Sequence, residues 1–103
     1  MSEKILPIPC TKVEEKTTKE WLQKINEELD ELKAEILDYI RLDDKIELLE
    51  IRLDNIWKSK ITEEAADTIT AITSMLEAMG IDEDMRQDAQ KRVNERNAER
   101  GRF

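Results

Sequence analysis

Apolar residues recur at spacings of three and four along most of this 103-residue chain, which predicts amphipathic helices. One row covers residues 22–39, and a second row, in a different phase, covers residues 42–56. The change of phase indicates either a kink or turn near residues 41–45 or one long helix that changes the face it buries. The stretch contains no glycine or proline, so these residues do not decide between a turn and one long helix.

A third apolar row predicts a helix over residues 61–79, the most apolar helix of the chain. The polar KSKIT stretch at residues 58–62 is expected to be the link that precedes it. The apolar residues of this helix are expected to lie in the core of a bundle: Ile61, Ile69, Ile72 and Leu76.

Short signals mark the ends of these helices. Thr17, with Glu20 three residues later, matches a capping box and predicts a helix start. Gly80 is expected to end the third helix, because glycine adopts the left-handed conformation without strain. Asp82 is expected to cap a last helix over residues 83–98.

The N-terminal segment reads differently, because both prolines of the chain, Pro7 and Pro9, lie in it. Proline lacks a backbone donor and disfavours helix at the residue before it. Residues 1–16 are therefore expected to form an extended arm, followed by a single helical domain over residues 17–103.

Composition supports an all-α fold with a thin core. Charged residues are 41% of the chain and aromatic residues only 4%, a balance that suits long helices but leaves little to bury within a monomer. We therefore expect an antiparallel helical bundle completed by oligomerisation. The net charge of −8 argues against duplex nucleic acid and anionic membranes as partners.

Cysteine and histidine usage narrows the chemistry. Cys10 is the only cysteine, so a disulfide within the chain is excluded, and the sequence has no histidine. No run of apolar residues is long enough for a membrane span, and no signal-peptide pattern opens the sequence, so a cytoplasmic location is expected.

Two pairs of acidic residues are candidates for a metal site. Glu28 and Glu31 lie three residues apart beside the first apolar row, and Glu64 and Asp67 repeat this spacing in the third helix. Like charges at this spacing repel unless a cation lies between them. If the two helices pack antiparallel, the four carboxylates would meet, and Mg²⁺ prefers such oxygens.

The same spacing also occurs on solvated helix faces, since 25 of the residues are acidic. Glu35 and Asp38 are such a pair, and we interpret them as solvent-exposed. Glu64 and Asp67 differ because they border the most apolar helix, where an unbalanced charge is unfavourable.

The C-terminal part, KRVNERNAERGRF, is basic in an acidic protein. Its cations either complement the helix dipole or bind phosphate oxygens. Trp21 and Trp57 are each either a core residue or a platform for a nucleobase.

Together, these motifs resemble the MazG-like, all-α nucleoside triphosphate pyrophosphohydrolases. EELDE at residues 27–31 and EEAAD at 63–67 resemble the paired acidic motifs of that family, and the basic tail is similar to that of small, phage-type members. The gap of about 32 residues between Glu31 and Glu64 is longer than is usual in the family.

The resemblance implies a function and a set of site residues. Glu28, Glu31, Glu64 and Asp67 would bind Mg²⁺, or Mn²⁺ in its place, and activated water would attack the α-phosphorus of an NTP or dNTP. Glu27 or one of the ligand glutamates, such as Glu28, would accept the proton of the water.

Substrate-binding residues implied by the resemblance are Lys91, Asn94, Arg96 and Arg100, with Trp21 as a base contact. The resemblance also implies a homo-oligomer, either a dimer or a tetramer. Two alternatives remain: a non-catalytic helical interaction protein and a nucleotide-binding sensor without turnover.

Overall fold

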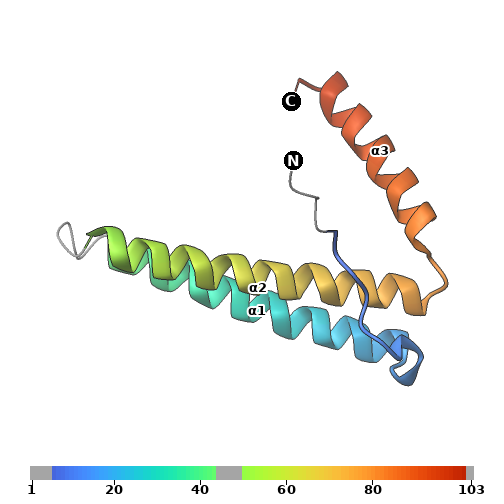
Figure 1. The fold of residues 1–103 in the computed structure, drawn as a ribbon, viewed down its shortest axis with the longest axis horizontal. Coiled ribbons are helices and arrows are strands. Elements are labelled where there is room, and N and C mark those ends of the chain that lie inside the picture. Colours follow the sequence, from blue (N-terminus) through green and yellow to red (C-terminus); the bar gives the residue numbers. More distant parts are fainter. Residues whose placement is uncertain (1–5, 44–49, 102–103) are drawn as a thin grey trace.

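A computed structural model describes residues 6–43 and 50–101, and within these residues it contains helices and no β-strand. Helices α1 (Thr18–Asp43) and α2 (Glu50–Ala78) pack side by side as a long antiparallel hairpin (Figure 1). Helix α3 (Glu83–Glu99) leaves the end of α2 and points away from the hairpin (Figure 1). The all-α fold is therefore confirmed. No helix in the described ranges combines the length and apolar character needed to cross a bilayer.

The start of α1 is the predicted capping box. The Glu20 amide donates to Thr17 Oγ1 at 3.2 Å, and the Thr17 amide donates to Glu20 Oε1 at 3.1 Å. The Glu20 carboxylate accepts from both the amide and the hydroxyl of Thr17, and these two bonds lower its pKa, with the bond from the backbone amide as the largest cause. Helix α1 ends at Asp43 and α2 begins at Glu50, so the first apolar row lies in α1, and the second row starts in α1 at Leu42 and ends in α2. The part of the second row at residues 44–49 lies outside the described ranges.

The prediction of a polar link at residues 58–62 is wrong, because α2 continues through this stretch without a break. The segment contains no glycine or proline, and its polar residues are compatible with a solvated helix face. Trp57 and Ile61 lie one turn apart and are both half-buried, so the buried face of α2 continues across it. Thr62 Oγ1 donates to the Lys58 carbonyl oxygen at 2.6 Å, which satisfies this hydroxyl within the helix.

The core of the hairpin is small, and hydroxyl side chains are prominent in it. Among the side chains that the structure describes, the buried apolar ones are Trp21, Ile25 and Ala71. Thr68, Thr73 and Ser74 are also buried, and each donates its hydroxyl to the carbonyl oxygen four residues earlier in α2. The helix therefore satisfies these polar groups internally and can still pack closely.

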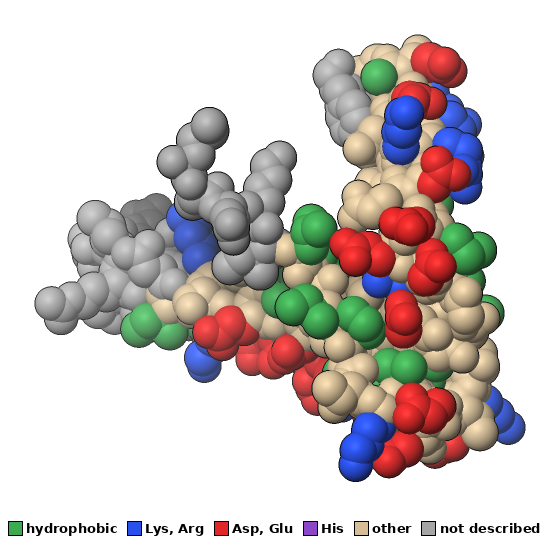
Figure 2. Space-filling view, turned by 45° about the vertical axis from the view of Figure 1, so that its right-hand side comes forward, with side chains coloured by type: hydrophobic (Ala, Val, Ile, Leu, Met, Phe, Trp, Pro, Cys, Tyr) green, Lys and Arg blue, Asp and Glu red, His purple; other side chains and the backbone are tan. Residues whose placement is uncertain are grey.

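The prediction that Ile69 and Ile72 lie in the core is wrong for a single chain, in which they are 48% and 38% exposed. Small and hydroxyl-bearing residues occupy the face of α2 that meets α1, whereas these isoleucines lie at its edge. Leu22 and Ile40 of α1 are likewise exposed. Figure 2 shows such hydrophobic side chains at the surface among acidic ones.

The described part of the N-terminal arm crosses the hairpin and is fastened to both helices (Figure 1). The Cys10 amide donates to Ser74 Oγ at 2.9 Å, and Trp21 Nε1 donates to the Val13 carbonyl oxygen at 2.9 Å. The arm is not extended throughout, because Val13–Glu15 form a short 3-10 turn after Lys12, which has a positive φ of 57°.

The junction of α2 and α3 follows its sequence signals. Gly80 has a φ of 81°, which only glycine adopts readily. Asp82 Oδ1 accepts from the Met85 amide at 3.0 Å, as expected for an N-cap. Arg86 then bridges back to α2 through a 2.6 Å contact with Glu77. Beyond that contact α3 has no buried residue.

The burial of Trp21 generates a prediction about stability. Trp21→Ala is expected to reduce the free energy of unfolding by about 3–5 kcal/mol, because it removes a buried ring and leaves the Val13 carbonyl without its donor. Trp57→Ala is the control, with a loss below about 2 kcal/mol because that ring is only half-buried. Urea denaturation followed by circular dichroism measures both, and equal losses would contradict the packing described.

Candidate metal centre

Side chains from α1 and α2 bring carboxylates together in the middle of the hairpin. Glu28 comes from α1, and Glu64 and Asp67 come from α2. One carboxylate oxygen from each lies within 4.8 Å of the others. Helical spacing produces this arrangement, because residues three apart share a face of α2 and that face meets α1 at Glu28. We call Glu28, Glu31, Glu64 and Asp67 the acidic cluster.

Glu31 belongs to this cluster through Glu64. The pKa of Glu64 is raised, first by partial burial and then by the charge of Glu31 and a hydrogen bond with it. The charges of Asp67 and Glu28 raise it further. Glu31 itself is exposed, so it lies at the outer edge of the acidic cluster.

Two oxygens of the acidic cluster are buried without a hydrogen-bond donor, namely Glu28 Oε2 and Glu64 Oε2. The Glu28 residue is only 7% exposed, so water satisfies it poorly. A buried carboxylate oxygen without a partner is unfavourable unless a cation or a proton compensates it. The residues present therefore fit a bound cation, and an all-oxygen donor set suits Mg²⁺ or Mn²⁺.

The spacing of these oxygens is compatible with a magnesium ion. Oxygens bound to one Mg²⁺ at about 2.1 Å lie at most about 4.2 Å apart. The separation of up to 4.8 Å among Glu28, Glu64 and Asp67 thus requires only small side-chain rotations. Water and ligand oxygens would fill the remaining positions.

Lys24 also touches the acidic cluster, which the sequence analysis missed. Its Nζ lies 2.9 Å from Glu28 Oε1, and its side chain is 45% exposed. The hydrogen bond with Glu28 is the largest cause of a raised pKa for Lys24. The sequence does contain a signal for this pair, because lysine and glutamate four residues apart on a helix are neighbours.

Glu35 corrects one interpretation from the sequence. It is half-buried, and its Oε2 is buried without a donor, so it is not on a solvated face. Glu35 follows Glu28 by seven residues, or two turns, and therefore lies on the same side of α1. Asp38, its predicted partner, is exposed as expected.

The other predicted site residues do not join the acidic cluster within one chain. Glu27 is exposed on α1. Trp21 is buried and hydrogen-bonded to the arm, so it is a core residue and its ring is not open to a nucleobase.

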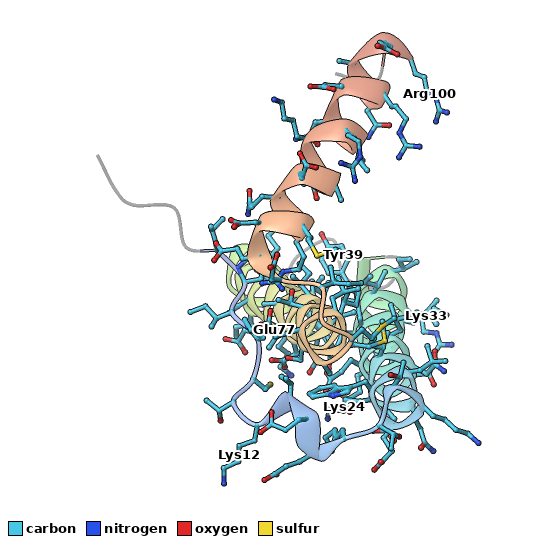
Figure 3. All side chains as sticks on the ribbon, turned by 90° about the vertical axis from the view of Figure 1, so that its right-hand side faces the viewer. Lys12, Lys24, Lys33, Tyr39, Glu77 and Arg100 are labelled. Atoms are coloured by element: carbon cyan, nitrogen blue, oxygen red, sulfur yellow. The ribbon has the colours of Figure 1, made fainter. Side chains whose placement is uncertain are left out.

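The residues predicted to bind substrate lie beyond the contact between Arg86 and Glu77, either on α3 or, for Arg100, directly after it: Lys91, Asn94, Arg96 and Arg100. All four are exposed, and Asn94 Oδ1 accepts from Gln90 Nε2 at 3.0 Å. Figure 3 shows Arg100 far from Lys24 and the hairpin.

The raised pKa of Glu64 predicts that Glu64→Gln increases thermal stability and that the increase depends on pH. Native Glu64 binds its proton more tightly than the unfolded chain does, so stability falls as pH rises from the ordinary glutamate pKa through the raised one. Without metal, Glu64→Gln is expected to raise Tm at pH 7, and the gain should vanish at a pH below the ordinary value.

The control is Glu63→Gln, which removes the same charge from an exposed position next to the acidic cluster. It is expected to raise Tm less than Glu64→Gln at pH 7. Equal increases in thermal melts of the two variants would mean that only the overall negative charge is being relieved.

No protein-family model matches this sequence, and no curated protein or solved structure matches the chain. The resemblance to the MazG-like family therefore rests on the motifs themselves.

Proposed function

We propose that this protein is a Mg²⁺-dependent nucleoside triphosphate pyrophosphohydrolase. The observation that carries the proposal is the meeting of Glu28, Glu64 and Asp67, from the two motif helices, around buried carboxylate oxygens that have no donor. The order of the acidic motifs along the chain also supports the proposal, because it resembles the order in the MazG-like family. Neither a histidine nor a glycine-rich phosphate loop offers another route to phosphate chemistry.

In this proposal the acidic cluster holds the metal ion. Glu28, Glu64 and Asp67 would bind it directly, and Glu31 would join them beside Glu64. A bound Mg²⁺ neutralises phosphate charge and lowers the pKa of a coordinated water. Water adds to the α-phosphorus of an NTP or dNTP, the bond to the bridging oxygen breaks, and the monophosphate and pyrophosphate leave.

The proton of the water would pass to a glutamate of the acidic cluster. Glu27 is less suitable than the ligand glutamates, because it is exposed and outside the group of converging oxygens. The pKa of Glu64 in the metal-free chain is raised above the ordinary glutamate value, and a higher pKa makes a carboxylate a stronger proton acceptor.

The proposal includes a homo-oligomer, because the hairpin leaves large apolar side chains exposed on both of its helices. Ile69 is two residues from Asp67, and Leu22 is two residues from Lys24, so these apolar residues lie on the sides of their helices opposite the acidic cluster. A second copy could cover such side chains and leave the acidic cluster accessible.

The enzymatic proposal predicts release of pyrophosphate from at least one nucleotide in the presence of Mg²⁺ or Mn²⁺. Glu64→Gln and Asp67→Asn are each expected to reduce the rate by at least about 100-fold, since even indirect neighbours of a metal commonly cost 10- to 100-fold. The measurement is a coupled pyrophosphate assay across canonical and modified NTPs and dNTPs.

Glu63→Gln is the matched control and should retain activity, because its side chain is exposed and outside the acidic cluster. Nucleotide binding without turnover across the whole panel would identify a sensor instead. If neither metal nor nucleotide raises Tm, the exposed apolar side chains favour the remaining alternative, a helical interaction protein.

The oligomer predicts a separate outcome for a surface substitution. Ile69→Lys places a charge at an exposed apolar position of α2 and is expected to shift the protein to a monomer, because burying an unpaired ammonium is unfavourable. Met85→Lys is the control, since Met85 is similarly exposed (52%) but lies at the start of α3. Size-exclusion chromatography with light scattering measures both masses, and a monomeric parent protein would contradict the proposed oligomer.

A further inference from the structure

Lys24 is the one cation for which the described residues record an ion pair with the acidic cluster. The contact is direct, at 2.9 Å from Lys24 Nζ to Glu28 Oε1. The other oxygen of the same carboxylate, Oε2, is buried and has no donor. One buried carboxylate thus has one oxygen neutralised by the chain and one oxygen left for a ligand.

The Lys24 side chain can leave this contact easily. It is 45% exposed, whereas the Glu28 side chain is 10% exposed, so only the carboxylate is fixed in the seam between the helices. A lysine ammonium is a point charge on a flexible stem and forms water contacts readily. The buried carboxylate needs a positive charge beside it, but a divalent cation can supply this charge in place of the ammonium and so displace it.

Once displaced, the ammonium remains tethered one helical turn from Glu28, at the rim of the acidic cluster. A metal ion there would bring anionic ligand oxygens to the same rim, where Lys24 is positioned to meet them. The cations of α3 do not supply this charge within one chain, because α3 points away from the hairpin (Figure 1).

We propose that Lys24 is an exchangeable counter-ion of the acidic cluster: its ammonium neutralises Glu28 in the metal-free protein, and it binds a phosphate oxygen of the ligand when a divalent ion takes its place. This inference rests on the proposed metal site and adds a residue and a ligand class to it. The same ammonium therefore weakens binding of the bare metal and strengthens binding of a metal–phosphate complex.

Two opposite effects of Lys24→Met test the inference. Calorimetric titration of the metal-free full chain with Mn²⁺ should give a dissociation constant about three- to tenfold lower in Lys24→Met, because no ion pair has to be broken. At saturating Mn²⁺, the variant should bind inorganic pyrophosphate at least about fivefold more weakly, the loss expected for one charged contact.

Lys33→Met is the matched control, because it removes the same charge from an exposed position of α1 on another side of the hairpin (Figure 3). It should leave both affinities close to those of the parent protein. Lys24→Arg keeps the positive charge and should retain most of the pyrophosphate affinity, which also covers the case in which Lys24→Met folds poorly.

The outcomes separate this inference from the proposed function. If the parent protein and Lys24→Met both fail to bind Mn²⁺, the metal site itself is wrong and the role of Lys24 falls with it. If the parent protein binds Mn²⁺ but Lys24→Met shows the same two affinities, only the role of Lys24 is overturned. Changes in Lys33→Met equal to those in Lys24→Met would also overturn it, because they would reflect net charge alone.

Discussion

Electrostatic repulsion among carboxylates in the seam between α1 and α2 is the constraint on which the rest of this structure depends. Glu28, Glu64 and Asp67 approach one another where the two helices pack, and two of their oxygens are buried without donors. Helices can remain packed at such a place only if positive charge or a proton compensates the carboxylates. The chain supplies part of this compensation through Lys24 and part through the raised pKa of Glu64.

The remaining contacts of the hairpin hold the acidic cluster together against this repulsion. Trp21 and Ile25 are buried near the start of α1. The arm is hydrogen-bonded to α1 through the Val13 carbonyl oxygen and to α2 through the Cys10 amide, which donates to Ser74. Because a core of this size contributes limited free energy, charge balance at the acidic cluster should affect the stability of the whole hairpin. Binding of an ion at the proposed site would therefore be linked to folding through the seam, because the site exists only while the two helices are packed.

Local signals made much of this fold predictable from the sequence. The capping box at Thr17, the left-handed Gly80 and the cap at Asp82 each depend on residues adjacent in the chain, and all three are confirmed. Helix existence also followed from the period of apolar residues. The link predicted at residues 58–62 was wrong because polar residues without glycine or proline do not end a helix whose buried face continues on both sides.

Predictions that required knowledge of packing fared less well. The burial of Thr68, Thr73 and Ser74 in place of Ile69 and Ile72 depends on which face of α2 meets α1, and hydrophobicity alone favours the isoleucines. The burial of Glu35 and the ion pair of Lys24 depend on the same packing of α1 against α2, since both residues lie on the edge of α1 that contains Glu28. Sequence spacing gave the pairs of acids, but only the antiparallel packing determines which acids lie in the seam.

Because of the position of α3, two groups that phosphate chemistry requires lie apart in one chain: the carboxylates for a metal ion and the basic residues for the phosphate. The acidic cluster is complete within the hairpin of one chain, whereas the basic residues Lys91, Arg96 and Arg100 lie on a helix that points away from it (Figure 1). A cation site can therefore form in a monomer, but the α3 residues can act on the same ligand only by movement of α3 or from a second copy. Lys24 is already beside the acidic cluster, so a single chain holds both the carboxylates that would bind a metal ion in the proposed site and one cation that would meet the phosphate.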